Sequence, residues 1–166
     1  MEKPHNLQLN KKDFDLTTPD DFVAVDHRCK GILLHFYKHL IAGGTLPTEA
    51  TLLANGADFF IRDFVVDQMA LNIFDEHPGI VRKFAGNWYI ITTVEPDIRQ
   101  LEEQLRGIKL LYRYLHGQKL VSSGYLAAIE QECDDVSFYR RRIETFWGIA
   151  GDGYMAWDKE CPLKGI

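Results

Sequence analysis

The most regular pattern of apolar and polar positions lies between Pro96 and Gly117. Apolar side chains recur there at intervals of three and four residues, at Ile98, Leu101, Leu105, Ile108, Tyr112 and Leu115. Because successive residues of an α-helix are rotated by about 100°, this spacing draws one apolar stripe along a helix. Pro96 suits the first helical turn, and Gly117 suits a left-handed stop at the end. The pattern predicts a helix of about 20 residues.

The C-terminal half of this predicted helix is apolar on two sides, because Leu110 and Tyr114 point away from the stripe. A helix of that kind is usually buried between neighbours on both flanks. The same spacing also suits packing against a second chain. The intramolecular interpretation is favoured, and an oligomeric interface is the alternative.

Capping residues and apolar stripes predict five more helices. Their expected ranges are Pro19 to the glycine pair 43–44, Pro47 to about Leu53, Ala57 to Phe74, Ser122 or Ser123 to about Cys133, and Asp134 or Asp135 through Phe146. The pair Asn55-Gly56 is a turn signal, so we expect it to break the chain between the second and third of these helices.

The segment from Ile80 to Val94 predicts strands rather than a helix. Residues 88–94 are all good strand formers, and residues 80–84 form a second apolar run. The intervening Ala85-Gly86-Asn87 has the composition of a tight turn. Together they predict a β-hairpin.

These elements define a mainly α fold, with about six helices and one β-hairpin in a single compact helical domain over residues 1–166. Residues 1–15 are polar and are expected to form a flexible N-terminal arm. The order of helices and hairpin between residues 20 and 94 also suits a winged-helix-like N-terminal half.

The charge distribution argues against nucleic acid as a partner. The chain has a formal net charge of −5, and residues 47–78 contain six acidic side chains against the single Arg62. That range would include the recognition helix of a winged helix, where phosphates would be repelled. An anionic membrane surface is excluded as a partner for the same reason.

The cysteines and the N-terminal residues bear on the compartment. Cys29, Cys133 and Cys161 are an odd number at long spacings, so the sequence indicates neither a disulfide framework nor a Cys-x-x-Cys metal site. The first residues are polar and do not form a signal peptide, and no uncharged apolar run approaches about 18 residues. We expect a soluble cytoplasmic protein.

Two pairs of residues form one candidate metal site. His35 and His39 stand four residues apart in the predicted first helix, a spacing that lets two imidazoles bind one metal ion. Asp63 and Asp67 are also four residues apart, on the apolar side of the predicted helix Ala57–Phe74. They would complete a divalent-metal site if the two helices packed side by side.

A structural role explains the same four residues more simply, and it is favoured. Histidines on the flank of a helix are commonly just partly exposed, and carboxylates on an apolar face are commonly paired with arginine. The arginines available for such pairs are Arg28, Arg113 and the 140–142 run. A divalent metal is therefore a cofactor that the sequence permits but does not favour.

Three consecutive arginines, Arg140, Arg141 and Arg142, fall in the last predicted helix. Successive positions fan across about 200° of a helix, so at most two of them can grip one anion. Acidic residues close in sequence favour a solvated, ion-paired surface. The alternative is a pocket for a small anionic ligand, with Arg141 as the residue that binds it.

No catalytic arrangement stands out in the sequence, and whether the protein is an enzyme stays open. The glycines at 148, 151 and 153 follow a predicted helix, whereas a phosphate-binding loop follows a strand. The leading hypothesis is a non-enzymatic protein-interaction or regulatory module, with a homodimer among its forms, because of the two-sided apolar helix and the aromatic residues after Gly148. The alternatives are a metal-binding protein or metal-dependent enzyme with the His/Asp site, and a binder of a small anionic ligand.

Overall fold

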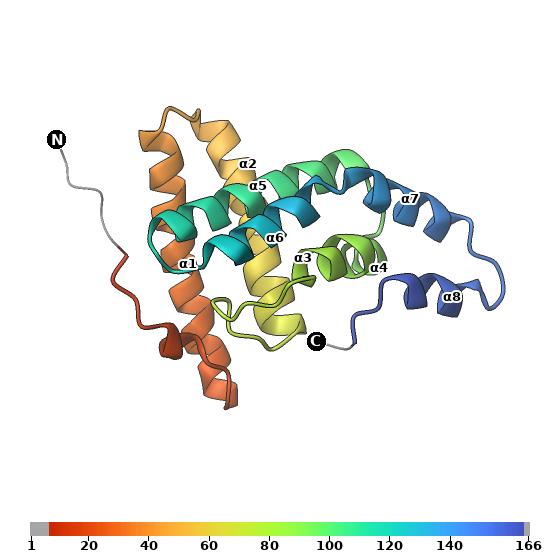
Figure 1. Ribbon diagram of the computed structural model, residues 1–166, viewed down its shortest axis with the longest axis horizontal. Helices are drawn as coiled ribbons and strands as arrows, with labels where there is room; N and C mark the ends of the chain where they lie inside the picture. The colour runs from red at the N-terminus through yellow and green to blue at the C-terminus, as the bar shows by residue number, and fades with distance from the viewer. Residues whose placement is uncertain (1–6, 165–166) are drawn as a thin grey trace.

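Helices form all the regular structure in the computed structural model, which describes residues 7–164 (Figure 1). Within that range the chain has seven helices, and none of them has the length and apolar composition needed to cross a membrane. Five of them are single α-helices, and two are composite, with π-helical segments joined to α-helical ones. Their bounds are α1 Pro19–Ala42; α2 Pro47–Asp58, continued by the π-helix η2 Phe59–Gln68; α3 Ile80–Lys83, η3 Phe84–Trp88 (π) and α4 Tyr89–Thr92 in one run; α5 Ile98–Gly117; α6 Ser123–Asp134; α7 Val136–Trp147; and α8 Gly153–Glu160, with a 3-10 turn η1 at Lys11–Phe14.

The helix predicted between Pro96 and Gly117 is confirmed as α5, Ile98–Gly117. Pro96 precedes the helix, and the Asp97 side chain caps it by accepting a hydrogen bond from the first turn. The left-handed residue after the helix is Lys119, with φ of 62°, and not Gly117. The apolar stripe therefore located the helix to within two residues, whereas the predicted left-handed stop at Gly117 is wrong.

Both apolar sides of α5 are buried within the chain. The stripe residues pack against α2 and α6, the two helices in closest contact with α5. On the other side, the Tyr114 ring lies 6.0 Å from that of Phe36 and 4.7 Å from that of His39, both in α1. Packing against neighbours in the same chain thus accounts for the two-sided pattern, and an interface with a second chain stays a prediction.

The predicted β-hairpin between residues 80 and 94 is wrong. Residues 80–92 form one continuous helical run, and residues 84–90 are all buried. A two-stranded hairpin leaves one face exposed, whereas a helix surrounded by other helices buries every side. The strand-forming residues are enclosed here by η2, α6 and α7, so tertiary packing overrides their β-propensity. The winged-helix-like arrangement, which needs the hairpin, is wrong for the same reason.

Asn55-Gly56 does not break the chain, because α2 runs through it into η2. Gly56 is a contact point with α5: a Cβ there would lie 2.7 Å from the Cα of Gln104. The reciprocal contact is at Gly107, where a Cβ would lie 2.3 Å from the carbonyl oxygen of Leu53. Two glycines on facing helices therefore let the backbones of α2 and α5 touch.

The predicted flexible arm, residues 1–15, falls partly on residues 1–6, which lie outside the described residues. From Leu7 onward the chain packs on the core. Phe14 is 1% exposed, and its ring lies edge-on to that of Phe74 with 4.8 Å between the centroids. The Asn72 side-chain amide donates to the Lys11 carbonyl and to the Asp15 carboxylate. These contacts bind η1 to the loop that follows η2.

The first turn of α1 is held by one carboxylate. Asp21 Oδ2 accepts hydrogen bonds from the Thr17 hydroxyl at 2.7 Å and from the main-chain N–H groups of Thr17 and Thr18, each at 2.8 Å. These three donors stabilise the ionised form and lower the pKa of Asp21 from the ordinary 3.8 to about 2. The carboxylate also lies at the positive end of the helix dipole.

We expect Gly107→Ala to lower the free energy of unfolding by about 3 kcal/mol, because its methyl group would overlap the backbone of α2. Gly56→Ala should cause a comparable loss. Gly31→Ala is the matched control: this glycine is also inside a helix, but nothing lies within 4 Å of its Cβ position. It should stabilise by about 0.5 to 1 kcal/mol. Urea unfolding of the three variants measures this, and a neutral Gly107→Ala would contradict the close approach of the helices.

Asp21→Asn should lower stability above about pH 4, where the wild-type carboxylate is ionised in both the folded and unfolded states. Since the folded-state pKa lies below the unfolded value, the contribution of Asp21 is lost as pH falls towards 2. Melting temperatures of wild type and variant should converge over that interval. Asp20→Asn, which removes a charge from the same turn, is the control. A wild-type advantage that persists at pH 2 would count against the assignment.

Candidate functional site

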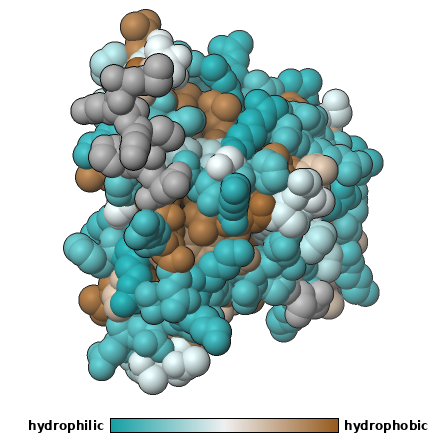
Figure 2. Space-filling model, turned by 60° about the vertical axis from the view of Figure 1, so that its left-hand side comes forward, coloured by the Kyte–Doolittle hydropathy of each residue, from teal (hydrophilic) through white to brown (hydrophobic). Residues whose placement is uncertain are grey.

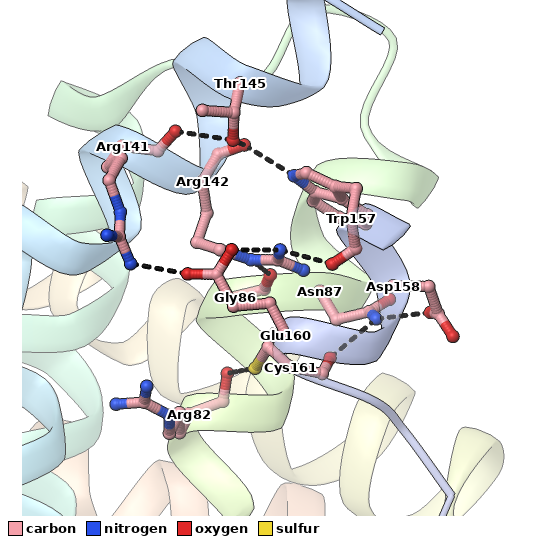
Figure 3. Close-up of polar contacts among 10 residues, drawn as sticks. All are labelled: Arg82, Gly86, Asn87, Arg141, Arg142, Thr145, Trp157, Asp158, Glu160 and Cys161. Atoms are coloured by element: carbon pink, nitrogen blue, oxygen red, sulfur yellow. Dashed lines mark hydrogen bonds and ion pairs between the residues drawn. The ribbon is translucent and has the colours of Figure 1, made fainter. Parts of the chain in front are cut away.

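A completely buried arginine marks the end of the molecule where α7 meets η3 and α8 (Figure 3). Arg142, in α7, is 0% exposed, although arginine is rarely buried without partners. Its Nε donates to the carbonyl oxygen of Gly86 in η3 at 2.8 Å, and its Nη1 donates to that of Trp157 in α8 at 2.5 Å. One guanidinium group therefore joins three helical elements.

The indole of Trp157 completes the surroundings of Arg142. The guanidinium carbon lies 3.7 Å from the ring centroid, within the range of a cation–π contact, and the indole Nε1 donates to the Arg142 carbonyl at 2.9 Å. Glu160 Oε2 lies 3.7 Å from Nη1 and supplies a nearby negative charge. Burial lowers the pKa of Arg142, but an arginine side chain keeps its proton in proteins, so the buried group is a cation.

The neighbouring turn of η3 contacts the last turn of α8 and the residue that follows it. Asn87 Nδ2 donates to Asp158 Oδ1 and to the Cys161 carbonyl, both at 2.8 Å. The glycine at position 86 makes room for this approach, because a Cβ there would lie 2.9 Å from Cys161 Sγ. The Cys161 thiol in turn donates to the Arg82 carbonyl at 3.3 Å. A larger residue in place of Gly86 would push the segment away.

Lys83 extends these contacts along the chain. Its ammonium group donates to the carbonyl oxygens of Pro162, Leu163 and Lys164, at 2.8, 3.4 and 3.2 Å. Main-chain carbonyls at five positions from 157 to 164 are thus bound by side chains of α3, η3 and α7. The segment is held largely by its backbone.

Two polar atoms in this site are buried without a hydrogen-bond partner in the described part of the chain: Arg142 Nη2 and Asn87 Oδ1. One is a donor and the other an acceptor, and both side chains are 0% exposed. Buried polar groups are nearly always satisfied in proteins, so each unpartnered one needs an explanation. The site therefore offers one unused hydrogen-bond donor, Arg142 Nη2, and one unused acceptor, Asn87 Oδ1.

An open cavity of about 460 Å³ lies beside this site, between α7 and α8. Its walls combine small residues with the indole of Trp157 and the carboxylate of Glu160; the lining residues are Thr145, Gly148, Ile149, Ala150, Gly153, Ala156, Trp157 and Glu160. Two further rings pack on the Trp157 side of the cavity: the Trp157 ring lies 5.0 Å from that of Phe146, at a tilt, and is stacked on that of Tyr154 at 6.0 Å. Helix α8 and the residues that join it to α7 form one wall of the cavity.

The four residues of the predicted metal site lie on two elements. His35 and His39 are in α1, where the His39 ring packs on Tyr114, and Asp63 and Asp67 are exposed on η2. Between residues 7 and 164, no group of three or more His, Cys, Asp or Glu side chains is arranged to hold a metal ion. The His/Asp metal site stays a prediction without geometric support.

The predicted arginine partners of those carboxylates bind other groups. Arg28 donates to the Asp13 carbonyl, and Arg113 pairs with Glu130 at 2.8 Å. Arg62, which was not among the predicted partners, pairs with Asp26 and Asp58. Neither Asp63 nor Asp67 forms an ion pair with a residue in the range 7–164.

The arginine run diverges to three different environments. Arg140 lies 3.7 Å from Glu102, Arg141 is exposed and pairs with Glu160 at 2.5 Å, and Arg142 is buried. Arg141 is the arginine predicted from the sequence to bind an anionic ligand, and that role remains a prediction. Arg142 was not predicted as a site residue, although a signal was present: it stands three residues after Tyr139 and therefore falls on the predicted apolar face of its helix.

Comparisons with protein-family models, with curated protein sequences and with solved structures found no match. The class of protein that the fold and site define is therefore a helical one with a buried-arginine site between η3, α7 and α8. The geometry of this site and of the surface beside it is the basis for inferring its function.

We expect Arg142→Lys to lower the free energy of unfolding by about 2 to 3 kcal/mol. A lysine keeps the charge but cannot reach both carbonyls in one plane or stack on Trp157 in the same way. Arg140→Lys, two residues away and exposed, should change stability by less than about 0.5 kcal/mol. Chemical unfolding of both variants provides the comparison, and equal effects would show that the buried fork does not matter.

Proposed function

We propose that this protein is a non-enzymatic interaction module that binds another protein through the surface formed by α7 and α8. The observation that carries the proposal is the set of exposed large apolar side chains beside the open cavity: Trp147 at 60% exposed, Met155 at 66%, and Tyr154. Tryptophan, tyrosine and methionine are enriched at protein interfaces, where one or two of them supply most of the binding energy.

The concentration of aromatic residues favours this surface over the rest of the molecule. Among the described residues, Trp147 and Tyr154 are the exposed large aromatic side chains, and both lie here. The Tyr154 ring stacks on that of Trp157, which packs at a tilt against Phe146, so Tyr154 rests on other rings that restrict its motion. A rigid aromatic surface loses little conformational entropy when it binds. A partner that places an apolar side chain in the cavity between α7 and α8 would fit it.

A second apolar surface lies along α1. Val23, Leu34 and Ile41 are exposed there, and their spacings of 11 and 7 residues place them on one helix face. Figure 2 shows the side of the molecule on which α1 lies in Figure 1, with brown apolar side chains gathered between teal polar ones. The predicted self-association through apolar helix faces would use this surface, and sedimentation of wild type against Leu34→Glu would detect it.

The proposal places the protein in the cytoplasm, because its three cysteines are buried and unpaired. Burial raises the pKa of Cys29 and of Cys133 to about 12, which keeps both thiols protonated and unreactive. The formal net charge of −5 argues against nucleic acid as the partner.

A photoreactive phenylalanine analogue at position 147 tests the proposal in cells of the source organism. We expect a discrete cross-linked partner, which mass spectrometry identifies, and loss of the adduct when Met155→Glu is added. The same analogue at Val94, which is 93% exposed and far along the chain from α7, is the control. Trp147→Ala should change the free energy of unfolding by less than about 0.5 kcal/mol, so binding and folding are separable.

If position 147 gives no adduct, or the same adducts as position 94 with no effect of Met155→Glu, the α7–α8 surface does not bind a partner.

A further inference from the structure

Residues 157–164 contact the body of the protein as a bound peptide contacts its receptor, and Figure 3 shows the first of these contacts, from Trp157 to Cys161. Side chains from outside the segment donate to its main-chain carbonyls: Arg142 to residue 157, Asn87 to residue 161, and Lys83 to residues 162–164. Recognition of backbone carbonyls is indifferent to side-chain identity and gives affinity for any peptide that follows the same path.

The side chains of the segment are recognised by charge and shape. The Trp157 ring packs under the Arg142 guanidinium, Asp158 accepts from Asn87 Nδ2, and Glu160 pairs with Arg141 at 2.5 Å. The receiving side chains Lys83, Asn87, Arg141 and Arg142, which we call the η3–α7 surface, thus carry three positive charges and one amide. Its charge complements an acidic peptide with a tryptophan.

Two further observations indicate that another peptide could take the place of residues 157–164 on the η3–α7 surface. Helix α8 makes its main helix contact with α7 alone, and exposed residues around Gly151 connect the two. Segment 157–164 also leaves Arg142 Nη2 and Asn87 Oδ1 unpartnered, although both lie within the buried site. A peptide that met this donor and this acceptor would gain hydrogen bonds that the protein's own segment does not make.

We propose that the η3–α7 surface is a binding site for an acidic, tryptophan-containing segment of another protein, and that residues 157–164 occupy it as an intramolecular competitor. The inference goes beyond the proposed function, because it concerns a second surface and names the chemistry of the segment that binds there. Because the competitor is tethered, its effective concentration is in the range of about millimolar. A segment from another protein therefore binds only weakly until the tethered one is loosened.

The experiment uses the full chain and a fluorescein-labelled peptide of residues 153–164 that carries Cys161→Ser. Anisotropy gives the affinity for wild type and for the double variant Asp158→Ala/Glu160→Ala, in which the tethered segment loses its side-chain contacts. We expect the peptide to bind the double variant at least about tenfold more tightly than wild type. Adding Lys83→Ala and Arg141→Ala to that variant should weaken binding at least about tenfold.

Two controls exclude binding to unfolded protein. A peptide in which the tryptophan is alanine and both acids are amides should bind at least about tenfold more weakly. Thiol labelling should become faster at Cys161 in the double variant and stay unchanged at Cys29 and Cys133, which lie in the core. Asp158→Asn replaces the double variant if that one does not fold.

Equal peptide affinity for wild type and the loosened variant, or equal affinity for the two peptides, would overturn the proposal. These results are independent of the cross-linking at position 147. Peptide binding without a cellular adduct would refute the α7–α8 surface while supporting the η3–α7 surface, and an adduct without peptide binding would do the reverse.

Discussion

The close approach of α2 and α5 is the constraint on which the rest of the structure depends. Gly56 and Gly107 have no side chains, and each backbone fills the place that a Cβ on the other helix would need. At this separation the aromatic side chains further along can interlock, and the Phe60 and Tyr112 rings lie 6.2 Å apart. Helix α5 packs against α2 on one side and against α6 on the other. The crossing of α2 and α5 therefore orients the helices that enclose the core.

The buried guanidinium of Arg142 sets how α7, η3 and α8 lie relative to one another, as the glycine pair does for α2 and α5. An unpaired buried cation is strongly unfavourable, so Arg142 needs carbonyl oxygens as partners, and Gly86 and Trp157 supply them. This requirement defines the position of α8 more narrowly than apolar contact would. The same polar groups make the η3–α7 surface selective for backbone carbonyls and acidic side chains, which connects the stability of this end to its proposed binding role.

How far the site could be predicted depended on whether its signals were local. The arginine run was visible in the sequence, and the helical period placed Arg142 beside Tyr139 on the apolar face. The identity of its partners was not predictable, because Gly86 lies 56 residues away and follows a segment with strand propensity. Likewise, the equal spacing of Asp63 and Asp67 on η2 and of His35 and His39 on α1 contains no information on whether their helices face one another.

By itself the sequence determined the helical class, the apolar stripe and approximate bounds of α5, and the start and end of α1, since these depend on residues within a few turns of each other. Tertiary structure decided the conformation of residues 80–92, the passage of α2 through Asn55-Gly56, and the burial of Arg142. For the first two, a local preference worth at most about 1 kcal/mol per residue is outweighed by contacts between segments far apart in the chain. For Arg142, the cost of burying a cation is offset by the carbonyl oxygens of residues 86 and 157, which only the fold brings to it. The glycines show the difference best: the sequence indicates that a Cβ is absent, and only the fold shows which neighbour occupies the space.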